Sequence, residues 1–436
     1  MRLQTRGNLS AGTATAATII VTVIMPRALR HPNFALFVSG QIFALIGYWI
    51  QQVALGWLVY RLTGSATLLG VLGFAANLPI LLLAPFAGLW SDRFNRHRMM
   101  IATQVFEMLQ AVTLTALAFS GAIEVWHIIV LTAFLGMCVA VELPVRHAYL
   151  LELVGGKEDL SNAVATTSLV ANCGRLIGPV IAGVLISRYS EATCFLINAL
   201  TYIAVLISFM FIRVQPQPRT QAHAPMWRGL GEGFAYAWNV VPIRLLLLLL
   251  AAIAVTAAPY STLMPAIVHD LFGGDARALG FLVGAGGMGA VAGTILLSIR
   301  RNVRGLLRFI LGAACMVGAA LVALSFSRWL AVSIALMSAI GFGMLVVTVS
   351  TNMILQTIVH DDKRGRVMSL YTAAFLGIVP LGALLAGVCA DRIGATTTVT
   401  IGGVLCICVA VAIARKLPEL RAHMRPIYAK LGLTLD

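Results

Sequence analysis

Three ionisable side chains stand inside apolar stretches long enough to cross a membrane, where charge is costly and marks a candidate functional site. Glu107 follows the basic residue Arg98 by nine residues, about 13 Å along a helix. A carboxyl group at that depth can bind and release a proton, so Glu107 is our candidate proton site, with a structural pair to an arginine as the alternative. Arg175 is expected to bind an anionic group of a ligand or to pair with Glu107. Glu142 precedes Arg146 by four residues, and we expect it to reach the cytoplasmic surface and pair there.

Uncharged polar residues recur on one face of the first apolar stretch. Gln41, Tyr48 and Gln52 are separated by seven and then four residues, which places them on one side of a helix. In a helix surrounded by lipid, such a face should point to an internal cavity that suits an amphipathic, partly aromatic ligand. For each residue an interhelical hydrogen bond is the alternative. The other cavity candidates are Asn77, Tyr260 and Asn352.

A short charged loop separates the second and third apolar stretches. Gly88 allows two helix backbones to approach closely. Asp92 can hold the N-terminus of another helix or an arginine. The basic residues of the loop, which favour a cytoplasmic position, are Arg93, Arg96 and Arg98.

Composition indicates that lipid is the solvent for most of the chain. The 436 residues are 60% hydrophobic and only 11% charged, whereas soluble proteins carry about 25% charged residues. A net charge of +15 would suggest nucleic acid in a soluble protein. Here the basic residues lie in short breaks between apolar runs, which is the pattern of membrane topology. We therefore expect no nucleic-acid partner.

The sequence contains no pattern typical of a cofactor site or an enzyme. The seven cysteines all lie in apolar runs without a Cys-x-x-Cys pair, so we expect small buried side chains, no metal and no disulfide. Gly155-Gly156-Lys157 is followed by Glu158, which excludes a phosphate loop at that position. We expect no cofactor, no direct use of ATP and no enzymatic activity.

Hydrophobic runs predict an all-α membrane protein with about twelve transmembrane helices, and their continuity excludes a barrel. Tyr260 lies between Pro259 and Pro265, which predicts a broken or bent span. The predicted spans are 34–60, 67–89, 99–120, 126–145, 161–187, 192–212, 244–267, 278–299, 306–326, 329–355, 367–389 and 396–415.

The longest polar interval divides these spans six and six. The predicted organisation is an N-terminal extension over 1–33, a first half over 34–212, a cytoplasmic linker over 213–243, a second half over 244–415 and a cytoplasmic tail over 416–436. Within the extension, residues 1–24 are expected either to be dispensable or to result from a misassigned start codon, with Met25 as the true first residue. Aromatic residues near the end of the linker predict a segment at the membrane surface.

The distribution of basic residues predicts the orientation. With the N-terminus inside, 25 of the 31 lysines and arginines lie on the cytoplasmic side, five lie outside and Arg175 lies within a span. This bias predicts that both termini are cytoplasmic.

The two halves resemble each other. Residues 159–188 align with 363–392 without a gap, and Gly178–Gly183 falls on Gly382–Gly387. Such a repeat is typical of carriers built from two halves around a midplane site. Small residues recur about once per turn in the fifth predicted helix and allow close helix packing. They are Gly174, Gly178 and Gly183.

The loop over 88–98 resembles the signature of the major facilitator superfamily, Gly-x-x-x-Asp-Arg-x-Gly-Arg-Arg, which joins helices 2 and 3. Asn95 replaces the usual glycine, and asparagine tolerates the left-handed backbone that glycine would supply. The stretches 57–66, 144–183 and 232–234 are similar to the bacterial branch that contains the enterobactin exporter. Relatives often carry an aspartate where this chain has Tyr48, which puts coupling through that position in doubt.

The resemblance implies proton-coupled export of a drug-like or siderophore-like molecule by a monomer in a bacterial inner membrane. It implies that Asp92 reaches the start of helix 11, near Gly365-Arg366, and closes the cytoplasmic side. Partners would be the small-molecule substrate, protons and lipid. Nutrient uptake by the same fold and a receptor without transport remain alternatives. The resemblance also implies an exporter-type motif in helix 5, comprising Arg175, Gly178, Pro179 and Gly183.

Overall fold

A computed structural model of the chain describes residues 27–156, 158–213, 234–300, 305–420 and 422. Twelve helices within these ranges are long and apolar enough to cross a membrane. The prediction of an all-α membrane protein with twelve spans is therefore confirmed. Residues 1–26 of the predicted extension over 1–33 and residues 214–233 of the predicted linker lie outside the described residues.

The first six spans form one bundle, which we call the first bundle. A short 3₁₀ turn, η1 (Arg27–Arg30), precedes it. Its helices are α2 (Pro32–Thr63), α3 (Ala66–Arg93), α4 (Arg96–Phe119), α5 (Val125–Leu153), α6 (Leu160–Arg188) and α7 (Glu191–Phe211).

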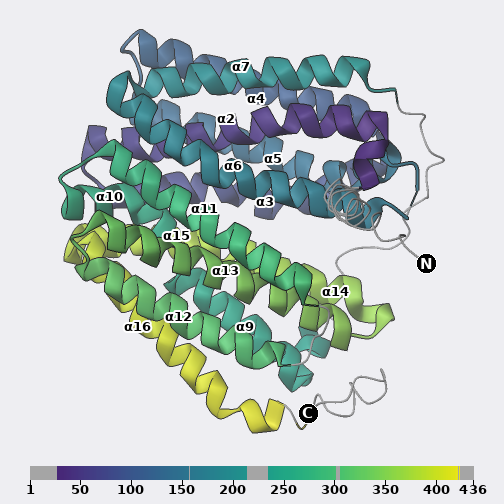
Figure 1. Cartoon of the computed structure of the whole chain (residues 1–436), viewed down its shortest axis with the longest axis vertical. Coiled ribbons are helices and arrows are strands. Elements are labelled where there is room, and N and C mark those ends of the chain that lie inside the picture. Colours follow the sequence, from purple (N-terminus) through teal and green to yellow (C-terminus); the bar gives the residue numbers. More distant parts are fainter. Residues whose placement is uncertain (1–26, 157, 214–233, 301–304, 421, 423–436) are drawn as a thin grey trace, which may run out of the picture.

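The last six spans form the second bundle, in which two spans are interrupted (Figure 1). Its elements are α9 (Val241–Thr256), α10 (Tyr260–Phe272), α11 (Ala276–Ile299), α12 (Leu306–Phe326), α13 (Leu330–Ile358), α14 (Asp361–Thr372), the π-helical turn η2 (Ala373–Gly377), α15 (Val379–Ile393) and α16 (Ala395–Arg415).

Most helix ends lie within a few residues of the predicted limits, because glycine and capping residues stop the helices where hydropathy falls. Gly64 ends α2 in the left-handed region, at φ 63°. Ser65 then begins α3, its hydroxyl accepting a hydrogen bond from the Leu68 N–H. The helix α5 is an exception: it continues to Leu153, beyond the predicted limit of 145, because the segment that contains Arg146, His147 and Glu152 is still helical.

The predicted break near Tyr260 is present. The seventh span stops at Thr256 and resumes at Tyr260, with Pro259 at the start of α10. The eleventh span is also interrupted, by η2 immediately before Pro380. That second interruption was not expected from the sequence.

An even number of spans places both ends of the described chain on one side. We call this side the near end, where α2 begins and α16 ends, and the opposite side the far end, where α2 ends and α3 begins. Large apolar side chains such as Met210, Phe326 and Trp329 are exposed around the bundles. A soluble protein rarely exposes so many of them, so this is the surface that lipid covers.

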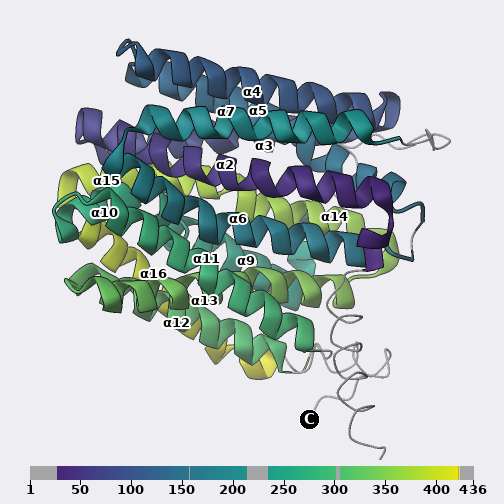
Figure 2. The ribbon, with the colours of Figure 1, turned by 45° about the horizontal axis from the view of Figure 1, so that its top comes forward.

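The two bundles meet through two helix pairs, α6 with α11 and α3 with α15 (Figures 1 and 2). These pairs are related by the internal repeat, since α6 corresponds to α14 and α15. A glycine lies at each contact. A Cβ on Gly183 would lie 2.7 Å from the Ala276 carbonyl oxygen, and one on Gly387 would lie 2.5 Å from that of Ala66. Only glycine lets the bundles approach this closely at the far end.

Candidate functional site

A cavity of about 290 Å³ lies between the two bundles. Its walls come from α2, α3, α5 and α6 of the first bundle and from α10, α11 and α13 of the second. Its size approaches the lower end of the range for small-molecule sites. Most of the lining is apolar or aromatic, and the polar members are Tyr48, Gln52, Asn77, Thr132, Arg175, Tyr260, Ser261 and Thr262.

Two of the sequence-derived cavity candidates lie elsewhere. Gln41 is buried on α2 and lines a separate void of about 10 Å³ beside Arg146. It misses the main cavity because this part of α2, two turns before Tyr48, packs against α5 and α6. Asn352 accepts a 2.6 Å hydrogen bond from Gln356 near the end of α13, outside the residues that line the cavity.

Arg175 faces the cavity from the middle of α6. Its guanidinium carbon lies 5.5 Å from the centre of the Trp49 ring, which is a cation–π contact. Glu107 instead belongs to a group that includes Glu142 and Tyr202, on α5 and α7. Arg175 was expected either to bind an anionic group or to pair with Glu107. The described ion pairs do not include a pair between Arg175 and Glu107.

Two carboxyl groups and one guanidinium form a buried cluster in the first bundle. Glu107 and Glu142 are each only 4% exposed. Glu142 accepts a 2.8 Å contact from Arg146, and Glu107 accepts a 3.2 Å hydrogen bond from Gln104. The other carboxyl oxygen of Glu107, Oε1, has no hydrogen-bond partner among the described residues. We call Glu107, Glu142 and Arg146 the carboxylate cluster.

The expectation that Glu142 reaches the membrane surface was wrong, although its predicted pair with Arg146 is present. The side chain of Glu142 is 5% exposed and that of Arg146 is 21% exposed. Sequence position gives depth along a helix but not which neighbours cover it. Here Glu107 of α4 adjoins Glu142, and residues of α2 and α6 line the small void beside Arg146.

Tyr48 connects the cavity to the carboxylate cluster. Its ring lines the cavity, and its hydroxyl lies within electrostatic reach of Glu107 and Glu142. Gln52, one turn later on α2, is its hydrogen-bonding neighbour and also lines the cavity. The residue that replaces the usual aspartate is thus placed between the two parts of the site.

A buried chain of amides adjoins this cluster and was missed by the sequence reading. Asn198 donates to Gln51 over 2.9 Å, and Gln51 donates to Gln110 over 3.1 Å, which ties α7, α2 and α4 together. A pattern was available in the sequence: Gln104, Glu107 and Gln110 recur every third residue along one face of a helix.

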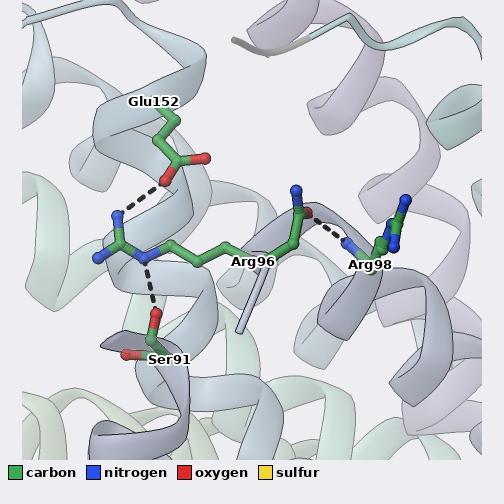
Figure 3. Close-up of polar contacts among 5 residues, drawn as sticks. Ser91, Arg96, Arg98 and Glu152 are labelled. Carbon is green, nitrogen blue, oxygen red and sulfur yellow. Dashed lines mark hydrogen bonds and ion pairs between the residues drawn. The ribbon is translucent and has the colours of Figure 1, made fainter. Parts of the chain in front are cut away.

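The charged loop at the near end is fixed by Arg96. Its guanidinium donates to Glu152 of α5 over 2.8 Å and to the Ser91 carbonyl over 3.2 Å, so it joins the ends of α3, α4 and α5 (Figure 3). Arg98 lies away from Glu152 in Figure 3 and is exposed. Arg93 is exposed as well.

Asn95 does not use the left-handed backbone that its residue type tolerates. Asn95 has φ −72° and ψ 115°, an extended conformation, because it is the N-cap of α4. Its side chain accepts a 3.0 Å hydrogen bond from the Arg98 N–H. The side chain of Asp92 and the surroundings of Gly88 are not among the described features, so the predicted contact of Asp92 near Gly365-Arg366 stays a prediction.

The small residues of α6 bring it against two neighbours. Gly174 packs on Leu45 and Gly178 on Trp49, both of α2. The Pro179 carbonyl, directly after Gly178, and Gly183 lie against α11 of the second bundle. The helix that carries Arg175 is therefore part of the contact between bundles.

A carboxylate closes the far end between α15 and α3. Asp391 accepts hydrogen bonds from the Ser65 hydroxyl at 2.8 Å and from the N–H groups of Ala66 and Thr67 at 2.6 and 3.0 Å. It caps a helix of the other bundle, where a negative charge is favoured. In the internal repeat Asp391 corresponds to Ser187, which accepts a 2.9 Å hydrogen bond from Arg277 of α11.

Comparison with known proteins identifies the family. Residues 25–430 match the family model described as transmembrane secretion effector. The chain is 30% identical to the staphyloferrin A transporter of Staphylococcus aureus, over 86% of this chain and 93% of that protein. It is 24% identical to the multidrug efflux pump Tap of Mycolicibacterium fortuitum (81% and 88% covered) and to macrolide efflux protein A of Streptococcus pyogenes (86% and 93% covered).

Solved structures agree on the fold. The nucleoside transporter NupG matches with a TM-score of 0.70 and 10% identity, covering 88% of this chain and 99% of that one. A bacterial homologue of the human lysosomal transporter Spinster, in an inward-facing and unoccupied conformation, matches with a TM-score of 0.65 and 13% identity, covering 92% and 98%. The resemblance seen in the sequence is thus confirmed, and the chain belongs to the transmembrane secretion effector family, an efflux-type branch of the major facilitator superfamily.

Proposed function

We propose that this protein exports small amphipathic molecules of drug or siderophore type in exchange for protons, by alternating access. The observation that carries the proposal is the position of the carboxylate cluster, which lies behind one wall of a cavity that the two bundles share. Multidrug and macrolide efflux pumps and a siderophore transporter among the relatives support the substrate class.

The cavity is the substrate site in this scheme. It is bounded by both bundles, so a rocking motion of one bundle against the other would open it to one side of the membrane at a time. Its apolar and aromatic walls suit an amphipathic body, while the hydroxyl and amide groups orient polar substituents.

The carboxylate cluster is the proton site. Two carboxyl groups and one guanidinium are neutral together when they hold one proton and carry a net negative charge when it leaves. A buried charge without a partner is costly, so loss of the proton favours a conformation in which water reaches the cluster. Glu107 carries the proton, because Glu142 is already paired with Arg146 and Glu107 Oε1 has no described partner.

Tyr48 transmits occupancy of the cavity to the cluster. A substrate that contacts its ring would move or re-orient its hydroxyl, and so change the electrostatic environment of Glu107. Tyr48 is a positioning residue here, and the missing aspartate of helix 1 is not needed for coupling.

The far end acts as the extracellular gate if both termini are cytoplasmic in a bacterial inner membrane, as the basic residues predict. Asp391 then holds α15 against α3 on the outside, and substrate release requires that these hydrogen bonds break. At the cytoplasmic side, Arg96 and Glu152 keep the charged loop in place. The protein works as a monomer in this proposal, because each bundle supplies its own part of the site.

Inside-out membrane vesicles test both direction and driving force. When ATP hydrolysis by the resident ATPase acidifies their interior, vesicles with this protein should accumulate at least one of two permanently charged dyes, sulforhodamine B (anionic) or rhodamine 6G (cationic), and a protonophore should release it. Glu107→Gln should abolish accumulation. Glu158→Gln, which removes an exposed carboxylate from a loop, is the matched control and should not.

The alternatives give different results. A nutrient uptake carrier would drive dye out of inside-out vesicles when the interior is acidic. A receptor without transport would move neither dye nor protons. Either result overturns the proposal.

A further inference from the structure

Arg175 gives the cavity a single fixed charge. It is the one ionised side chain among the described residues that line the cavity, and no aspartate, glutamate or histidine lines it with Arg175. Its described contact is with the Trp49 ring rather than with a carboxylate. A partly buried guanidinium without an anionic partner is unfavourable, and an anion bound in the cavity would neutralise its charge.

A second unpartnered polar group lies in the same wall. Thr132 of α5 is 1% exposed, lines the cavity, and its hydroxyl has no hydrogen-bond partner among the described residues. A hydroxyl is available to donate to an acceptor oxygen of a ligand. The rest of the lining combines uncharged polar residues, such as Gln52 and Asn77, with aromatic and apolar residues that include Tyr260, Val283 and Met337.

From this arrangement we propose that the cavity binds small organic anions with an aromatic or apolar body, and that Arg175 binds the anionic group. A guanidinium suits this role, because its planar fork can donate two parallel hydrogen bonds to a carboxylate, sulfonate or phosphate group. Trp49, whose ring the guanidinium contacts, lines the same cavity. This inference rests on the proposed function for the use of the cavity and names the chemical class of its substrate.

Arg175, which we call the anchor, also lies at the contact between bundles. A Cβ on Gly287 of α11 would lie 2.7 Å from the Arg175 carbonyl oxygen, so the backbone of Arg175 packs directly on the second bundle. An anion that pulls on the Arg175 side chain therefore acts on the helix pair α6–α11, whose relative motion alternating access requires.

Binding of two dyes to the purified full-length protein in an uncharged detergent tests the anchor. Sulforhodamine B and rhodamine 6G share a xanthene ring and carry opposite permanent charges. By fluorescence polarisation, the wild type should bind sulforhodamine B more tightly. Arg175→Gln should weaken sulforhodamine B binding about ten- to hundredfold, the usual worth of a hydrogen bond to a charged group, and should leave rhodamine 6G binding unchanged or tighter.

Two further variants separate the anchor from general damage. Arg175→Lys keeps the charge but loses the fork, and should weaken sulforhodamine B less than Arg175→Gln does. Arg188→Gln removes an exposed arginine from the end of the same helix and should change neither dye. Preference of the wild type for rhodamine 6G, or equal weakening of both dyes by Arg175→Gln, overturns the proposal.

Transport in vesicles of phosphatidylcholine, which contain no anionic lipid to compete, distinguishes this inference from the proposed function. If a proton gradient drives dye accumulation but Arg175→Gln does not change sulforhodamine B binding, the assignment of Arg175 as the anchor is wrong and the proposed function stands. If Arg175→Gln weakens sulforhodamine B binding but a proton gradient drives accumulation of neither dye, the proposed function is wrong and the assignment of Arg175 as the anchor stands.

Discussion

The carboxylate of Asp391, near the end of α15, accepts a 2.6 Å hydrogen bond from the backbone N–H of Ala66, the first residue of α3. These residues are 325 positions apart and belong to different bundles. One side chain of the second bundle therefore caps a helix of the first. In the proposed alternating access, opening of the far end must break this cap, so its strength would contribute to the balance between conformations.

Asp391→Asn should favour opening of the far end. The substitution removes the charge and weakens hydrogen bonds that are worth about 1.5 kcal/mol or more, which corresponds to about a tenfold change in population. Hydrogen exchange of the amides in the first turn of α3 should become correspondingly faster. Asp275→Asn is the matched control, because Asp275 caps α11 from within its own bundle. If Asp275→Asn accelerates hydrogen exchange in the first turn of α3 as much as Asp391→Asn does, Asp391 does not hold the two bundles together.

Arg146→Gln should destabilise the protein strongly. It leaves two buried carboxyl groups without their cation, and breaking a buried ion pair on one side costs about 3–5 kcal/mol. The midpoint of thermal unfolding in detergent should fall accordingly. The double variant Glu142→Gln with Arg146→Gln restores the charge balance and should recover part of the loss. A double variant less stable than Arg146→Gln alone would contradict the charge argument.

Tyr48→Phe should uncouple substrate from protons without emptying the cavity. The ring and its apolar contacts remain, so dye binding should stay within about twofold of the wild type, whereas loss of one hydrogen bond can reduce coupled proton release by about tenfold. Tyr260→Phe removes a hydroxyl from the opposite wall, in α10, and should leave proton release intact. If the two variants behave alike, Tyr48 is an ordinary lining residue.

The sequence predicts the helices well because hydropathy, proline and glycine act locally. The twelve spans and the break before Tyr260 follow from such local features. The surroundings of side chains are harder to predict, because they depend on neighbouring helices. Glu142 was expected at the surface from its spacing to Arg146, but neighbouring helices bury it.

The contact between bundles at the far end could not be predicted from the sequence. The cap on α3 depends on the orientation of two helices that meet through the fold rather than through the chain. Asn95 shows the same limit on a smaller scale: the residue type allowed a left-handed turn, and the helix that begins next to it required an N-cap instead.

Proton release on substrate binding tests the central claim most directly. When a transported dye is added to the purified protein in unbuffered detergent solution, the wild type should release protons into the medium, because substrate binding moves the proton from Glu107. Glu107→Gln should still bind the dye, since Glu107 lies outside the cavity lining, but should release none. Release by Glu107→Gln equal to that of the wild type would contradict the assignment of the carboxylate cluster as the proton site.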